Sequence, residues 1–140
     1  MHPILRNILA VIAGLVLGSI VNSALVNVGP SIIPLPEGTD VGDMEKLAEA
    51  MSNFSPRHFL FPFLGHALGT LVGAYVAARI AMTHKTTFAI VIGAVFLTGG
   101  IVMTFLLPAP IWFTALDLIF AYIPMALLGG RLAGAGMKSQ

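Results

Sequence analysis

Asp117 is the one acidic side chain inside a long apolar segment of this 140-residue chain. An ionised carboxylate near the middle of a bilayer costs about 2.5 to 3.5 kcal/mol, so such residues usually face the protein interior and have a partner or a task. Asn22 and His66 stand in two other apolar segments. Histidine titrates near neutral pH; a neighbouring carboxylate favours its charged form and burial opposes it. A buried His–Asp pair would therefore offer proton exchange.

These three side chains are expected at one level of a helical bundle. Counted at 1.5 Å per residue from the nearer end of its apolar segment, each lies roughly 9 to 10 Å deep. Thr114 precedes Asp117 by three residues and shares its helix face. We therefore predict a buried polar cluster of Asn22, His66, Asp117 and Thr114. The alternative is that the same network only locks the packing of the helices.

Other kinds of site are weakly supported. His58 and His66 with Asp117 could bind a metal, but no H-x-x-x-H or E-x-x-H spacing supports this, so neither a metal site nor a cofactor is expected. Cysteine is absent, which excludes thiolate catalysis and cysteine-ligated metals. The chain contains no G-x-S-x-G elbow, P-loop or dinucleotide-binding glycine pattern. An enzyme is the least supported class.

The composition is that of an integral membrane protein. Hydrophobic residues make up 57% of the chain and charged residues only 9%, against about 25% charged in soluble domains. The net charge is +1 and the basic residues are scattered, so no nucleic-acid partner is expected. Five of the six acidic residues lie between Glu37 and Glu49, which predicts that this stretch stays in water.

The apolar segments predict a single all-α domain over 1–140, with four transmembrane helices in an up-down antiparallel bundle. About 20 residues are needed to cross the hydrocarbon layer. The expected helices are about 8–28, 56–79, 86–107 and 111–130. A cleaved signal peptide is the alternative for the first segment, but the segment is long for one and no A-x-A site follows it.

Glycines, prolines and helix-capping residues indicate where the helices are connected and where one is kinked. Glycines and prolines crowd into residues 29–42, so the first loop is expected to begin at residue 29 and to extend to 55. Within it, Asp43 and apolar residues at helical spacing predict a short amphipathic helix at about 43–51. This helix either lies on the membrane surface or only connects the first two spans. Ser55-Pro56 predicts the next helix start. Pro124 predicts a kink in the fourth helix.

Small residues recur every four positions in the first two spans. In lipid, such spacing lets helix backbones approach closely. Packing within the bundle is the favoured interpretation, and a dimer face is the alternative. The residues concerned are Gly14, Gly18, Gly65, Gly69, Gly73 and Ala77.

Basic residues near the ends of the spans predict the orientation. Lys46 and Arg57 lie on one side and five basic residues on the other, which places both termini in the cytoplasm, in a bacterial inner membrane. The five are Arg6, Arg79, Lys85, Arg131 and Lys138.

Two functions remain open from the sequence. The first is a structural or accessory membrane protein that assembles with itself or with a partner subunit in the lipid bilayer. The second is a small permease or channel component that uses the Asn/His/Asp cluster to handle protons or cations. Because four helices enclose little volume, a conducting pore would need a homo-oligomer.

Overall fold

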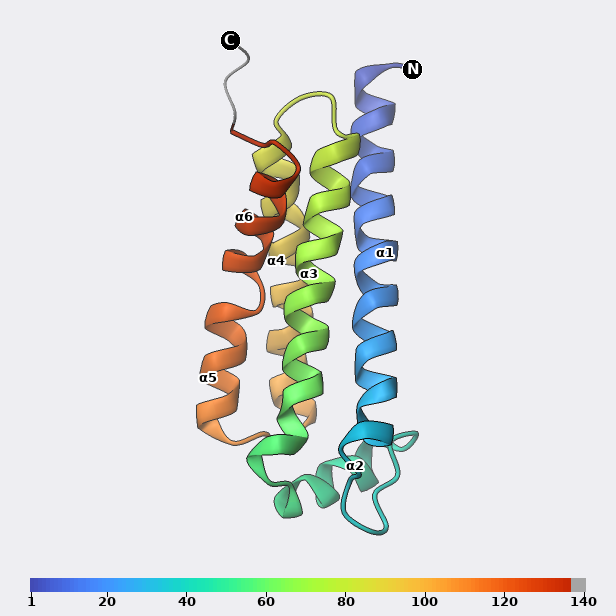
Figure 1. Cartoon of the computed structure of the whole chain (residues 1–140), viewed down its shortest axis with the longest axis vertical. Helices are drawn as coiled ribbons and strands as arrows, with labels where there is room; N and C mark the ends of the chain where they lie inside the picture. Colours follow the sequence, from blue (N-terminus) through green and yellow to red (C-terminus); the bar gives the residue numbers. More distant parts are fainter. Residues whose placement is uncertain (137–140) are drawn as a thin grey trace.

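The computed structural model describes residues 1–136, which form helices running up and down along one axis (Figure 1). Four helical segments are long and apolar enough to cross a membrane: Pro3–Ile32, Pro56–Ile80, Lys85–Leu106 and Ile111–Leu132. This confirms the expected fold class, an all-α four-helix bundle of membrane type with a short helix in the first loop. We call the end with residues 33–59 the loop end, and the end with the N-terminus the terminal end.

The first helix, α1 (Pro3–Ile32), is longer at both ends than the expected 8–28. It continues through Pro30, so the prediction that the loop begins at residue 29 was wrong. A proline lacks one N–H donor and costs most in a helix interior. Pro30 lies in the last turn, which closes with a 2.8 Å hydrogen bond from the N–H of Ile33 to the carbonyl of Gly29. The loss is therefore limited to one bond near the helix end.

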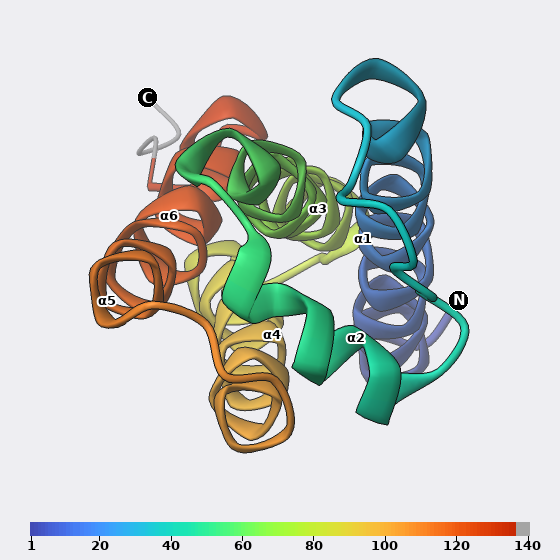
Figure 2. The ribbon, with the colours of Figure 1, turned by 90° about the horizontal axis from the view of Figure 1, so that it is seen from below.

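The loop carries α2 (Met44–Ala50), which begins where Asp43 caps it. An Asp43 carboxylate oxygen accepts from the N–H groups of Glu45 and Lys46, at 3.0 and 3.2 Å. Such a cap satisfies donors that the first helical turn leaves free. Two short 3₁₀ turns follow, Met51–Asn53 and Pro56–Phe59. Seen from below, the segment with α2 crosses the end of the bundle (Figure 2).

The third and fourth helices are α3 (Leu60–Ile80) and α4 (Lys85–Leu106). α3 packs against α1, α4 and α6 and so holds the bundle together. At the terminal end, the side chain of Arg6 donates to the carbonyl of Ile80 at 2.7 Å, and Asn7 bonds to the α3–α4 connection. The start of α1 is thereby fixed to the end of α3.

The fourth span was expected as one kinked helix over 111–130. The structure instead has two helices, α5 (Ile111–Phe120) and α6 (Ile123–Leu132), offset from each other (Figure 1). Pro124, in the first turn of α6, has no N–H to offer the carbonyl of Phe120. Ala121 and Tyr122 lie between the two helices, and Tyr122 has a φ of −115° and a ψ of −79°. The expected kink is thus a break between two helices.

The small-residue positions of the first two spans face each other between α1 and α3. A Cβ added to Gly14 would lie 2.6 Å from the carbonyl oxygen of Gly73, and one added to Gly18 would lie 2.7 Å from that of Gly69. Ala77, the last position of the series, is fully buried against Gly14. No side chain fits between these backbones. Within residues 1–136, the series is therefore used for packing α1 onto α3.

Candidate functional site

His66 of α3 and Asp117 of α5 form a close pair. Nδ1 of His66 lies 2.9 Å from both carboxylate oxygens of Asp117. Because a carboxylate accepts hydrogen bonds, the imidazole donates from Nδ1 and leaves Nε2 as its free ring nitrogen. The side chain of Asp117 is only 7% exposed, whereas that of His66 is 25% exposed. The carboxylate is therefore buried behind a histidine that remains accessible.

Tyr122 completes the group, and sequence reasoning did not identify it. Its hydroxyl donates to Asp117 at 3.1 Å, and its ring stacks on that of His66 with centroids 5.7 Å apart. In a continuous helix, residues five apart point about 140° away from each other. The break before α6 removes that restriction and turns Tyr122 back toward Asp117. Only the proline two residues later hinted at this arrangement.

Asn22 does not join the pair, contrary to the expected Asn/His/Asp cluster. It lies in the seam between α1 and α3, where its Oδ1 would be 2.7 Å from a Cβ added to Gly65. Gly65 faces α1, and His66 points about 100° around the helix from it. Equal depth therefore did not bring the side chains together. Asn22 Oδ1 is buried and has no hydrogen-bond partner in residues 1–136.

A cavity of about 290 Å³ reaches from the pair to the loop end. His66 and Asp117 line it, as does Thr114, which makes no side-chain hydrogen bond within the described residues. The walls are mostly apolar and come from α1, the α2 segment, α3, α4 and α5. They include Val26, Ile33, Leu35, Met44, Leu47, Met51, Phe54, Phe59, Phe61, Met103, Leu107 and Phe113.

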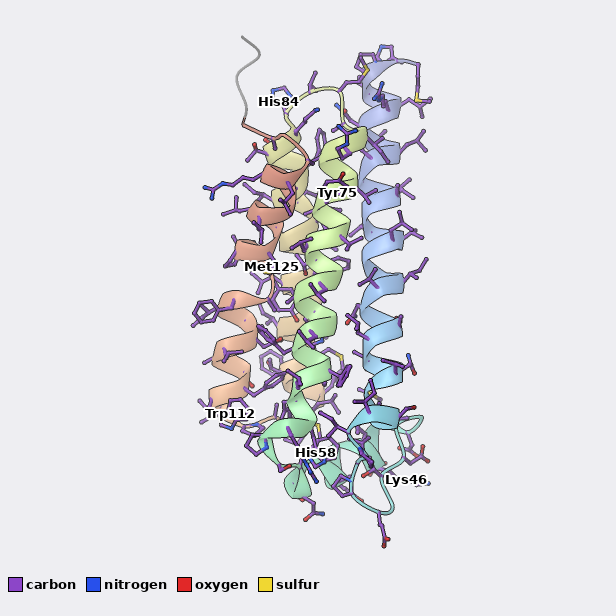
Figure 3. The ribbon with its side chains drawn as sticks, in the orientation of Figure 1. Lys46, His58, Tyr75, His84, Trp112 and Met125 are labelled. Atoms are coloured by element: carbon purple, nitrogen blue, oxygen red, sulfur yellow. The ribbon has the colours of Figure 1, made fainter. Side chains whose placement is uncertain are left out.

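His58 fastens the loop over this cavity. Its Nδ1 accepts from the N–H of Ser55 at 2.9 Å, and its Nε2, 3.1 Å from the carbonyl oxygen of Pro34, donates to it. His58 is largely buried and lies among the side chains of the loop end, as does Trp112 (Figure 3). Both ring nitrogens are thus used to hold backbone. Residues 1–136 contain no group of three His, Asp or Glu side chains that could hold a metal ion.

The charges around the cavity are unequal at its two ends. Arg57 lines it near the loop end, and no Asp or Glu of residues 1–136 lies within ion-pair distance of Arg57. None of the acidic residues between 37 and 49 lines the cavity. Carboxylate oxygens of Asp40 and Asp43 instead lie 3.7 and 3.9 Å from Nζ of Lys46. At the deep end, the carboxylate of Asp117 accepts hydrogen bonds from His66 and Tyr122.

The terminal half of the bundle is closed by tightly packed small residues. Ala67 and Ala121 pack with Tyr122 beside the pair. Further toward the terminal end the core consists mainly of alanines, with Ile92 as its large member. The pair therefore faces the loop-end cavity and is separated from the terminal end by packed side chains.

Comparison with known proteins adds no family to this description. No protein-family model matches the chain, and no significant match was found among curated proteins or solved structures. Within residues 1–136, the cavity offers a histidine with one unbonded ring nitrogen, held by a buried carboxylate to which a tyrosine also donates.

Proposed function

We propose that this protein is a small membrane permease that takes up and releases protons at His66, which is positioned by Asp117. The observation that carries the proposal is the location of the His66–Asp117 pair in the wall of a cavity, since a pair that only locked helices together would need no cavity. Intramembrane ionisable groups that face a cavity often belong to ion or proton pathways.

Proton uptake at His66 requires only the side chains of His66, Asp117 and Tyr122. Nδ1 of His66 stays bonded to Asp117, so the ring keeps its orientation while Nε2 accepts a proton from the cavity. The carboxylate stabilises the positive ring that results, and the hydroxyl of Tyr122 holds the carboxylate. Release toward the other side requires the packing around Ala121 to open.

The break between α5 and α6 supports such a movement. Discontinuous membrane helices recur at transport sites because they combine free backbone groups with a point where half a helix can move. The break follows Asp117 by only a few residues, so a tilt of α5 against α6 would change the surroundings of the pair. This is a rearrangement of one half-helix, while α3 and its seam with α1 stay fixed.

The proposal includes location and assembly. Four apolar helices favour insertion into a membrane, and the charge bias favours a bacterial inner membrane with cytoplasmic termini. At the terminal end this bias rests on Arg6, Arg79, Lys85 and Arg131; Lys138 lies outside the described residues. The loop-end cavity would then open to the outside. The bilayer is the environment, and a homo-oligomer or a membrane partner would complete any pathway.

Proton movement into reconstituted vesicles tests the proposal. Vesicles with a trapped pH-sensitive dye and an imposed potassium diffusion potential should acidify faster with the parent chain than without protein. Asp117→Asn should reduce that rate at least tenfold, to the level of empty vesicles. The control is Thr98→Val, because Thr98 bonds only to its own helix and does not line the cavity. Equal rates for Asp117→Asn and the parent chain would refute proton handling by the pair.

A structural or accessory membrane protein is the second candidate. The observation that favours it is that His66 and Tyr122 both bond to Asp117, which ties α3 and the break before α6 to α5. Absence of flux from every variant, together with loss of a partner or of the oligomer on Asp117→Asn, would support this role instead.

A further inference from the structure

We infer that the loop-end cavity binds an apolar aromatic molecule carrying one hydroxyl group, of the phenol class. As a statement about the substrate, this rests on the proposed permease function. As a statement about binding, it rests on the walls, the polar end and the charges of the cavity.

The walls suit an apolar aromatic body. At about 290 Å³, the cavity is near the lower end of the range of about 300 to 1,000 Å³ typical of small-molecule sites. Four phenylalanines line it, and aromatic rings prefer offset or edge-to-face contact with other rings. Three methionines add flexible surface that adapts to a ligand. These residues are Phe54, Phe59, Phe61, Phe113, Met44, Met51 and Met103.

The deep end of the cavity offers one strong acceptor. The carboxylate of Asp117 already accepts from His66 and from the hydroxyl of Tyr122. With Nδ1 donating, Nε2 of His66 carries a lone pair, and within residues 1–136 the side chain of His66 makes hydrogen bonds only through Nδ1. A ligand hydroxyl satisfies this nitrogen, whereas an ether oxygen has no proton to give. The deep end of the cavity therefore favours a ligand with an O–H donor over one with an ether oxygen.

The charges argue against an organic cation as the ligand. Arg57, the one Lys or Arg among the lining residues, lies near the loop end, and no acidic residue between 37 and 49 lines the cavity. Asp117, its one carboxylate, is buried behind His66, and its oxygens already accept from His66 and Tyr122. A cation in the cavity would find no exposed carboxylate oxygen to pair with, so a neutral hydroxyl compound fits better.

The chain contains its own reporter for this binding. Trp112 is its single tryptophan, and its ring lies 5.8 Å from those of Phe59 and Phe113, both of which line the cavity. A bromine atom in the cavity quenches tryptophan emission at short range. The probe is 4′-bromobiphenyl-4-ol, and the comparison compound is its methyl ether, which lacks only the O–H.

We expect saturable quenching of Trp112 by the bromophenol in the purified, bilayer-embedded protein. Binding of the ether should be about fivefold weaker, the effect of one hydrogen bond. The double variant His66→Phe with Asp117→Leu removes both pair members, and the Tyr122 hydroxyl that it frees can donate equally to a phenol or an ether oxygen, so this preference should vanish. Equal affinities for the two compounds in the parent chain would overturn the inference.

Two threonines of α4 give a matched pair of variants. Thr104 lines the cavity and Thr98 does not, although each bonds only to a carbonyl of its own helix. Thr104→Phe should fill the cavity and abolish saturable quenching, and Thr98→Phe should leave it unchanged. Unchanged quenching in Thr104→Phe would show that the probe binds elsewhere, and the inference would fall.

Failure of the binding experiment and failure of the proton-flux experiment can be told apart. Selective binding of the phenol without proton flux dependent on Asp117 would leave the binding site standing and remove the permease. Proton flux without saturable phenol binding would retain the permease and remove this ligand class.

Discussion

The two halves of the bundle are built differently. In the terminal half, backbones touch through glycine and alanine, and the core around Ala77 and Ile92 is closed. In the loop half, large aromatic side chains and methionines surround a cavity that ends at His66 and Asp117. In lipid, helices associate mainly through close packing and hydrogen bonds. The difference indicates that one half fixes the helices, which leaves the other half free to enclose a space.

The largest expected effect comes from the terminal half. Gly14→Leu would place a side chain where a Cβ already lies 2.6 Å from a backbone oxygen of α3. We expect destabilisation by about 3 kcal/mol, the upper range for overpacking, measured by unfolding in mixed micelles. Gly99→Leu is the control, because a Cβ there meets nothing within 4 Å. Similar stabilities for the two variants would contradict the assignment of the seam.

The next effect comes from the buried carboxylate of the loop half. Asp117→Leu leaves both the imidazole N–H of His66 and the hydroxyl of Tyr122 without their acceptor. Unpaired buried donors cost about 1 to 3 kcal/mol each. Because His66 is partly exposed, we take the lower end for both donors and expect a loss of about 2 kcal/mol in the same unfolding assay. Unchanged stability would mean that water in the cavity satisfies these donors. That result would sharpen the contrast with the closely packed terminal half.

A smaller effect is expected from Tyr122→Phe. This change removes one hydrogen bond to the carboxylate and keeps the ring that stacks on His66. Because hydrogen bonds to charged groups are worth about 1.5 to 3 kcal/mol, we expect a loss near 1.5 kcal/mol. A double-mutant cycle with Asp117→Leu should show that the two losses do not add. Full additivity would mean that the tyrosine and the carboxylate do not interact.

The smallest effect is expected at the edge of the loop half. Asp43→Ala removes the cap of α2 and should cost about 1 kcal/mol. Because α2 carries Met44 and Leu47 of the cavity wall, hydrogen exchange should rise in residues 44–50 and stay unchanged in α3. Equal exchange in variant and parent would show that the cap does not hold the roof of the cavity.

The sequence predicted the helices well because their causes are local. Runs of apolar residues without charges, and prolines or glycines between them, predicted all four spans and the capped α2. The end of α1 was misjudged because Pro30 is tolerated in a last turn. The break at Ala121 was expected only as a kink at Pro124.

The site was less predictable because it depends on which way each helix turns. Depth along the spans correctly suggested that His66 and Asp117 share a level, but it said nothing about rotation. Asn22 therefore appeared to belong with them, although it faces the seam with Gly65. Tyr122 could not be found, since only a broken helix brings it back to Asp117.

Reactivity of two single cysteines tests the contrast between the halves most directly, because the chain has no cysteine of its own. Thr114 lines the cavity, whereas Thr70, one turn beyond His66, is 1% exposed. Each is replaced by cysteine in a separate variant, and each variant is reconstituted in sealed vesicles. A membrane-impermeant thiol reagent is then added on the side of the loop end. We predict rapid modification of Thr114→Cys and none of Thr70→Cys. Equal reaction of both, or an inert Thr114→Cys, would contradict the account.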